Sequence, residues 1–382
     1  MRNIFVFVLC LFTITGCKNN RECEDDTLID EVFEITPKSD KEKVRYSDLF
    51  DSVRYVRLET TNEILIKDIT RLKCVNGKIY ILDNKTQTLF CFHMDGKLNW
   101  KIRQVGQGPQ EYTRLTDFDM DEKKGRLYLF SYNDKILVYD LSGNFINAYY
   151  VRLAGTSFVS SEEYLYVYAN NNPNKIEGVE QNNYLLLFDE EKDVVKGRLP
   201  FNTDKRFGTM NTYNASNAFC RYEDEVRFFM PFSNNIYSLQ EDTIYIKYQF
   251  DFGEYNLPDT YFENYTTDDI RESKYAYGLN SFWENNKYFS FNTYINKEYY
   301  QILYDKSVDK MYTGILSDDI SYCSPLLREV TDDYAMGCLL AEDLFLINNF
   351  SKESRENAIF KEIISEMTED DNPVVLFYYF RK

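Results

Sequence analysis

One pattern occurs twice in this chain, as ITRLKCVNGKIYILD over residues 69–83 and as LTDFDMDEKKGRLYLF over residues 115–130. In both copies a strand-like run leads into a turn containing glycine and then into a second run rich in aliphatic and aromatic residues. The turn glycines Gly77 and Gly125 are 48 residues apart, and a later pair of turn glycines is 47 residues apart. A repeat of this length, with four strands in each copy, is typical of β-propeller blades.

The rest of the chain continues this rhythm. We expect an all-β fold in which residues 49–382 form a six-bladed β-propeller. The first strand, residues 53–58, and the last, residues 373–380, each lack a complete blade of their own. Pairing them in one sheet would close the ring and leave no strand edge exposed. Residues 257–278 and 351–371 interrupt the pattern and are expected to be two short helical insertions. A seven-bladed ring would fit the bare period, but the sequence offers no seventh set of strands.

The composition suits such a fold and excludes one class of partner. Aromatic residues make up 17% of the chain, with 33 Tyr and 29 Phe, and these side chains favour the half-buried surface of a β-sheet. The formal net charge is −18 at pH 7. Binding to phosphate backbones draws most of its affinity from Lys and Arg, so we expect no nucleic-acid partner.

The N-terminus is typical of an exported lipoprotein. Arg2 precedes an apolar run over residues 4–14, which is too short to span a bilayer as a helix. The run ends in Ile-Thr-Gly-Cys17, which resembles the lipobox of bacterial lipoproteins. We therefore expect a signal peptide over residues 1–16, lipidation of Cys17 and a flexible polar tether over residues 17–48. The alternative is an ordinary cleaved signal peptide in which the cysteine is incidental.

These features predict that the mature protein lies in the cell envelope. We expect it to be attached to the outer membrane, at either the surface or the periplasmic side. Acyl chains, rather than a spanning segment, would hold it there. The membrane is then its first partner.

Residue types that usually carry catalysis or metal binding are sparse. His93 is the only histidine, whereas metal hydrolases and triad enzymes normally need one or more, and we expect it to be a surface residue. The six cysteines after Cys17 lack the spacing of zinc sites and are expected to be small buried side chains with free thiols. Asp117, Asp119 and Asp121 begin like a calcium loop, but the sixth and twelfth positions do not fit. Alternation along a strand explains them better, and we expect no metal, no cofactor and no catalytic residue.

The connection into the second copy makes the chain recognisable. Residues 104–112 read QVGQGPQEY, and the following strand leads to GRLYL and VYDLSG. This order resembles the NHL-type repeat. Together with the lipobox, it resembles the six-bladed β-propeller lipoproteins of gut-type Gram-negative anaerobes, with the match covering residues 55–150. The resemblance implies a propeller fold and an envelope location, and it implies no settled activity.

The same connector supplies the candidate site residues. Its glycines and proline suit a tight turn between blades, and on that interpretation it contacts no ligand. Loops between blades also often face the binding surface of a propeller. On that second interpretation Gln107, Glu111 and Tyr112 line the mouth of a funnel.

The sequence favours binding over catalysis. An export signal and a binding-type scaffold occur here without a recognisable nucleophile, metal set or phosphate loop. We predict non-catalytic binding of a glycan, a peptide or a partner protein through one face of the propeller. The alternative is a hydrolase or lyase that uses carboxylate or tyrosine side chains at the centre of the ring. Converging carboxylates of raised pKa on the ring axis would favour the enzyme, whereas an apolar or water-filled channel with exposed aromatic side chains on one rim would favour binding.

Overall fold

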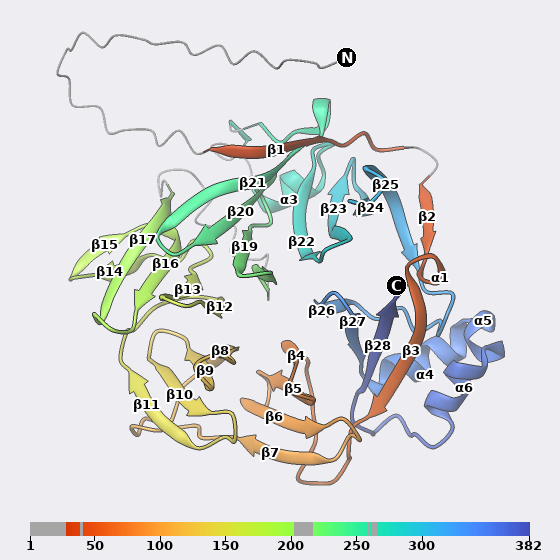
Figure 1. Cartoon of the computed structure of the whole chain (residues 1–382), viewed down its shortest axis with the longest axis horizontal. Coiled ribbons are helices and arrows are strands. Elements are labelled where there is room, and N and C mark those ends of the chain that lie inside the picture. The colour runs from red at the N-terminus through yellow and green to blue at the C-terminus, as the bar shows by residue number, and fades with distance from the viewer. Residues whose placement is uncertain (1–27, 39–40, 202–216, 259, 262–265) are drawn as a thin grey trace, which may run out of the picture.

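The computed structural model describes residues 28–38, 41–201, 217–258, 260–261 and 266–382. Within these residues six β-sheets, each built on four antiparallel strands, are arranged as a closed ring (Figure 1). Each sheet is one propeller blade, and its first strand lies nearest the central axis. The predicted six-bladed β-propeller is confirmed.

The blades follow the chain in order. Blade 1 contains β4 (Arg71–Val75), β5 (Lys78–Asp83), β6 (Thr88–His93) and β7 (Leu98–Ile102). Blade 2 contains β8 (Leu115–Asp121), β9 (Arg126–Ser131), β10 (Ile136–Asp140) and β11 (Phe145–Tyr149). Blade 3 contains β12 (Ser157–Ser160), β13 (Tyr164–Tyr168), β16 (Asn183–Asp189) and β17 (Val194–Pro200), with the hairpin β14 (Asn174–Ile176) and β15 (Val179–Gln181) inserted before β16.

The second half of the ring repeats this plan. Blade 4 contains β18 (Phe219–Tyr222), β19 (Glu225–Phe229), β20 (Asn235–Gln240) and β21 (Thr243–Asp251). Blade 5 contains β22 (Tyr277–Glu284), β23 (Tyr288–Ile295), β24 (Glu298–Asp305) and β25 (Lys310–Ser317). Blade 6 contains β26 (Leu327–Val330), β27 (Tyr334–Leu339), β28 (Val374–Phe380) and β3 (Phe50–Arg57).

Blade 6 closes the ring with strands from both ends of the propeller. β28 pairs antiparallel with β3 in a register that places Leu376 opposite Tyr55. The hydroxyl of Tyr378 on β28 donates to Oδ2 of Asp318 at 2.8 Å, in the loop that follows blade 5. The predicted closure is therefore confirmed, and it is tied to the neighbouring blade as well.

The turns between strands have the chemistry that the sequence indicated. Asn76 and Gly77 adopt positive φ angles of 51° and 66°, which a tight hairpin turn of this type requires. Gly96, with φ of 85°, lies so close to the carbonyl of Arg57 that a Cβ atom there would be 2.0 Å from its oxygen. A glycine at this position therefore lets blade 1 approach the closing strand of blade 6.

Two strands extend the ring outward and correct the predicted tether. β1 (Ile29–Glu34) pairs parallel with β21, and β2 (Glu42–Arg45) pairs parallel with β25. Blades 4 and 5 therefore have five strands each. Of the tether expected over residues 17–48, the part from Ile29 onward belongs mostly to the propeller, because these residues satisfy the outer edges of two sheets. The residues before 28, including the predicted signal peptide and Cys17, lie outside the described part.

The helices are short and lie outside the blades. They are α1 (Tyr46–Leu49), the 3-10 turn η2 (Gly253–Tyr255), α3 (Thr267–Arg271), α4 (Ala341–Phe350), α5 (Lys352–Glu356) and α6 (Ala358–Ile364). Thr266 caps α3 by accepting a hydrogen bond from the backbone of Asp269. With α3 in the first predicted insertion and α5 and α6 in the second, both insertions contain helix. The second begins earlier than predicted, with α4. Among the described helices, none is long and apolar enough to cross a membrane.

The hydrophobic core is divided among the junctions between blades. Each of the six junctions holds its own cluster of buried side chains. Alternate residues of one strand face opposite neighbours. On β5, Tyr80 packs toward blade 2 while Ile79 and Ile81 pack toward blade 6. This arrangement explains the high aromatic content, because wide gaps between radial sheets need large side chains.

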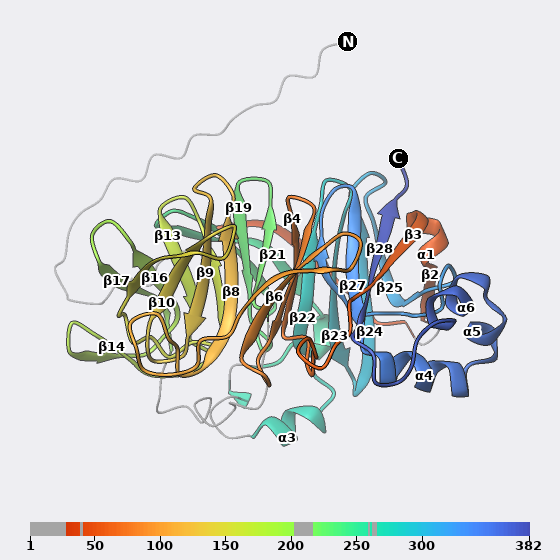
Figure 2. The ribbon, with the colours of Figure 1, turned by 90° about the horizontal axis from the view of Figure 1, so that it is seen from below.

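The ring has two distinct faces. We call the face that carries the turn between the first and second strands of each blade the hairpin face. The opposite face carries the connections from one blade to the next, and we call it the connector face. In Figure 2 the C-terminus and α1 lie on the upper, hairpin side, and α3 lies on the lower, connector side.

Candidate functional site: an acidic pocket and a charged axis

A large pocket opens on the hairpin face above blades 2, 3 and 4. Its volume is about 820 Å³, which lies within the range of about 300–1,000 Å³ that small-molecule sites occupy. Its walls are the β8–β9, β12–β13, β18–β19 and β20–β21 turns. We call it the face pocket. Four turns on rigid strands therefore shape one hollow.

Carboxylates dominate the lining of the face pocket. Five of its acidic residues make no ion pair within the described part of the chain, and all five are exposed: Glu122, Glu162, Glu163, Glu223 and Glu241. Three further acids are paired, as Asp121 with Lys124, Asp224 with Lys123, and Glu225 with Arg227. Eight carboxylates thus face three cationic lining residues, Lys123, Lys124 and Arg221. The pocket presents a strongly negative surface.

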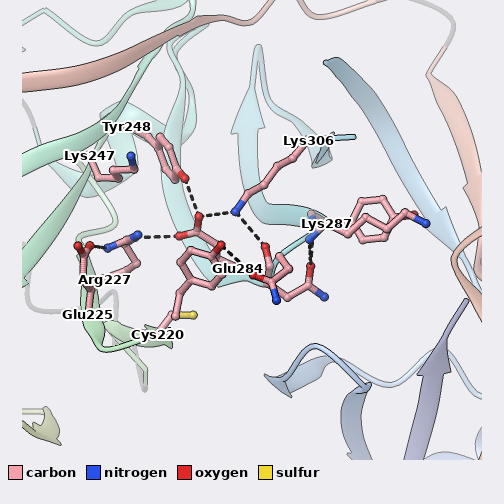
Figure 3. A network of polar contacts seen from close by, with 12 residues as sticks. Cys220, Glu225, Arg227, Lys247, Tyr248, Glu284, Lys287 and Lys306 are labelled. Carbon is pink, nitrogen blue, oxygen red and sulfur yellow. Dashed lines mark hydrogen bonds and ion pairs between the residues drawn. The ribbon is translucent and has the colours of Figure 1, made fainter. Parts of the chain in front are cut away.

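One wall of the face pocket is fixed by a buried network between blades 4 and 5 (Figure 3). Arg227 on β19 bonds Glu225 at the pocket edge and also donates through Nε to Oε2 of Glu284 at 2.8 Å. Oε1 of Glu284 accepts from Tyr248 at 2.5 Å and from Lys306 at 2.7 Å. The Glu284 side chain is fully buried. Because protein donors occupy both of its oxygens and no part of the side chain is exposed, we assign it a structural role.

A second, much smaller cavity lies on the ring axis. Its volume is about 80 Å³, enough for about five water molecules. It is lined by residues of five of the innermost strands, β4, β12, β18, β22 and β26. We call it the axial cavity. Arg221 lines both this cavity and the face pocket, so the two hollows are neighbours.

Charged side chains are packed around the axial cavity. Asp119 on β8 is fully buried and bonds Lys73 of blade 1. Its Oδ2 accepts from Arg221 of blade 4 at 2.5 Å and from the hydroxyl of Ser160 in blade 3 at 2.9 Å. Burial alone would raise the pKa of Asp119, but Arg221, Lys73 and Arg71 hold it well below the usual range. One carboxylate thereby joins four blades.

The pKa of the neighbouring Asp117 is raised rather than lowered. Its Oδ2 accepts the backbone N–H of Phe158 at 2.7 Å and lies 3.7 Å from the Arg71 guanidinium. Burial raises the pKa of Asp117 to about 6, and Arg71 only partly offsets this. Glu329 on β26 lines the axial cavity, and burial raises its pKa to about 7, opposed by Lys73. Two carboxyl groups of raised pKa therefore lie near the axis.

Carboxyl groups of raised pKa on the axis would favour an enzyme. The axial cavity, however, is too small to hold a substrate beside them. The axial cavity is about a tenth of the volume of the face pocket, and ligand pockets are several times larger. Asp117 is only 1% exposed. A sugar ring or a peptide has no room to reach these carboxyls.

The connector residues predicted to line a funnel lie on the connector face, opposite the face pocket. Tyr112 is completely buried, and its hydroxyl donates to the carbonyl of Gln87 at 2.7 Å. A direct ligand contact by Tyr112 was therefore wrongly predicted. Oε2 of Glu111 accepts the backbone N–H of Gly108 at 2.8 Å, so this carboxylate holds the turn. Gln107 is exposed, and its role in ligand binding stays a prediction.

The other residues singled out from the sequence are also placed. His93 is exposed at the end of β6, as predicted. The five described cysteines are free thiols and buried or half-buried. Within the described residues, no group of three or more His, Cys, Asp or Glu side chains is arranged to hold a metal ion. The lipidation site Cys17 lies outside the described part.

The residues that line both hollows were not predicted as site residues from the sequence. Asp117 and Asp119 were noticed, but only as strand alternation. Their two-residue spacing on the innermost strand of a recognised blade was the available signal, because that strand borders the axis. Arg221 and Glu329 lie on β18 and β26, which are short and were not predicted as strands.

The sequence matches, over residues 30–379, the family described as Domain of unknown function (DUF4934). The chain belongs to this family. The match begins within β1 and ends within β28, so the domain includes both outer strands as well as the six blades. A comparison with curated proteins gave no match.

Two of the solved structures that match this chain are Bacteroides proteins. A Bacteroides fragilis NCTC 9343 protein assigned as exported is 20% identical, with a TM-score of 0.73, covering 92% of this chain and 100% of that one. A DUF4221 family member from Bacteroides vulgatus ATCC 8482 is 10% identical, with a TM-score of 0.49, covering 87% of this chain and 97% of that one. The first of these shows a shared propeller fold.

Proposed function

We propose that this protein is a non-catalytic binding protein of the cell envelope that captures a positively charged peptide segment in the face pocket. The observation that carries the proposal is the pocket itself, about 820 Å³ in volume with eight carboxylates against three cations. A peptide rich in Lys and Arg offers charges of the opposite sign at a spacing that several turns can meet. The segment belongs either to a free peptide or to a partner protein.

The geometry supports binding rather than chemistry at this site. The five acids without ion pairs are solvated and lie on turns, so they attract cations at no cost of burial. The wall around Glu225 is held by Arg227, Ser238 and Gln240, so the pocket is largely formed before a ligand arrives. Catalytic acids would need a substrate at the axis, where the cavity is too small.

We also propose that the chain is anchored to the membrane through lipid on Cys17. The charged start, the short apolar run and the Ile-Thr-Gly-Cys17 ending support this. The similar Bacteroides protein assigned as exported supports an envelope location. The outer membrane fits a lipidated protein of this kind.

A labelled peptide of alternating Lys and Ala tests the proposed ligand class. Its fluorescence anisotropy in the presence of the full chain should rise saturably, and the matching Glu-Ala peptide should give no rise. Raising the salt from 50 to 300 mM should weaken binding by about tenfold, because exposed charges are screened. The combined variant Glu162→Gln, Glu163→Gln and Glu223→Gln should weaken binding by a further tenfold or more.

The control removes the same charge elsewhere. Glu180→Gln, Glu369→Gln and Asp370→Asn alter three exposed acids outside the face pocket. This variant should bind the Lys-Ala peptide within about twofold of the unaltered chain. Equal weakening in both variants would mean that overall charge, and not the face pocket, attracts the peptide.

A further inference from the structure

Among the described residues, the cations that line the axial cavity outnumber the carboxylates at and behind its wall. Four cations line it, Arg71, Lys73, Arg221 and Arg328, against the single lining carboxylate Glu329. Asp117 and Asp119 do not line the cavity but lie behind its wall. Asp117 pairs with Arg71, and Asp119 pairs with Lys73 and Arg221. Four cations therefore face three carboxylates, in a chain whose net charge is −18.

Arg328 is the cation without a counter-ion. Among the described residues it makes no ion pair, and its buried Nε atom has no hydrogen-bond partner. Burial lowers the pKa of Arg328, with only weak compensation from Cys338 and Asp68. An arginine stays charged in proteins, so a guanidinium without an ion pair attracts an anion into the cavity that it lines. The Nε atom is enclosed by protein atoms, so such an anion would meet the terminal nitrogens of the guanidinium.

We propose that the axial cavity is a binding site for one small oxyanion, with Arg328 as its principal partner. A volume of about 80 Å³ suits a group of four or five heavy atoms and excludes a sugar or a peptide. The planar guanidinium fork matches two oxygens of a sulfate-like or carboxylate-like group. The ligand would neutralise the excess charge where five blades meet, so this site takes the opposite ligand charge from the neighbouring face pocket, with which it shares Arg221.

Glu329 makes the binding depend on pH. Its carboxyl faces Lys73 and Arg71 from β4, and the Cys74 backbone N–H donates to its Oε2 at 2.9 Å. Asp119 from β8, Arg221 from β18 and Tyr334 from β27 also act on it. Above about pH 7 the ionised Glu329 repels an anion. Below that pH it is neutral and its proton can be donated to an oxygen of the ligand. Oxyanion affinity should therefore rise as the pH falls from 8 to 6.

Sulfate is the appropriate probe, because its charge does not change over this range. Calorimetric titration of the full chain with sodium sulfate, at ionic strength held constant by a bulky sulfonate salt, should show saturable binding to one site. Arg328→Gln should weaken this binding at least tenfold. Arg271→Gln, which changes an exposed arginine on α3, should leave it within twofold.

Two further variants keep the test decisive. The unaltered chain should bind sulfate several-fold more tightly at pH 6 than at pH 8. Glu329→Gln should lose most of this difference and keep only the part that comes from protonation of Asp117 near pH 6, which frees Arg71. If Arg328→Gln fails to fold by circular dichroism, Arg328→Lys retains the charge without the fork and should still lose several-fold. Absence of saturable binding, or unchanged affinity in a folded Arg328 variant, would overturn the proposal.

Discussion

Individual buried charged side chains in this ring link neighbouring blades through hydrogen bonds and ion pairs. Glu284 is the clearest example, because its two oxygens receive Arg227 and Tyr248 from blade 4 and Lys306 from blade 5 (Figure 3). Lys306 also lies 4.2 Å from the centre of the Tyr222 ring. Burying such charges is favourable only while every partner is present. The network therefore tolerates little change at its central carboxylate.

Glu284→Gln should destabilise the fold by roughly 3 kcal/mol, because Arg227 and Lys306 would lose the negative charge between them. Urea denaturation followed by tyrosine and tryptophan fluorescence measures the loss. Asp224→Asn is the matched control, since it breaks a pair with Lys123 at 3.4 Å in which both side chains are exposed. That change should cost less than about 0.5 kcal/mol. Similar losses in both variants would contradict a structural role for Glu284.

At the scale of strands, the sequence predicted those whose two faces are both apolar. β5 and β9 alternate large side chains toward two neighbouring blades, and their period identified the fold. β18 and β26 were not predicted, because each has only four residues and charged residues such as Arg221 and Glu329 interrupt the apolar pattern. The axial strands β4 and β8 also carry charged residues, but the sequence repeat made them recognisable. The face pocket could not be predicted either, because its acids come from turns whose meeting depends on the ring.

The outer strand β1 was not predicted either, because its residues show no apolar pattern. Its sequence IDEVFE is mostly exposed and resembles a solvated tether. Phe33 is the exception, since its ring lies 4.8 Å from that of Tyr304 and 5.3 Å from that of Phe289, measured between centroids. One aromatic side chain thus joins the strand to the junction of blades 4 and 5.

Phe33→Ala should lower the free energy of unfolding by about 1–3 kcal/mol, less than the loss at a fully buried phenylalanine because the side chain is half-buried. Hydrogen exchange should also accelerate at Ile246, whose backbone N–H donates to the carbonyl of Leu28 at 2.9 Å. Val32→Ala changes a side chain that is 57% exposed and should alter neither quantity measurably. If Phe33→Ala behaves like Val32→Ala, β1 does not contribute to the stability of the ring.

At the scale of the whole molecule, β1 determines where the chain enters the propeller. It runs parallel to β21, which starts at the hairpin face, so Leu28 lies at that face beside blade 4. The β20–β21 turn, which lines the face pocket, is at the same end. Ile29 is twelve positions after Cys17, a reach of at most about 40 Å. A lipid on Cys17 would therefore keep the acidic face close to the membrane.

Cys17→Ser should release the protein from the membrane, because the acyl chains proposed at this thiol would supply the anchoring energy. Partition between detergent-rich and aqueous phases measures the effect: the unaltered protein should enter the detergent phase and the variant the aqueous phase. Cys23→Ser, six residues further along, should remain with the detergent. An unaltered protein found in the aqueous phase would show that Cys17 is incidental, and the acidic face would then be free of any fixed relation to the bilayer.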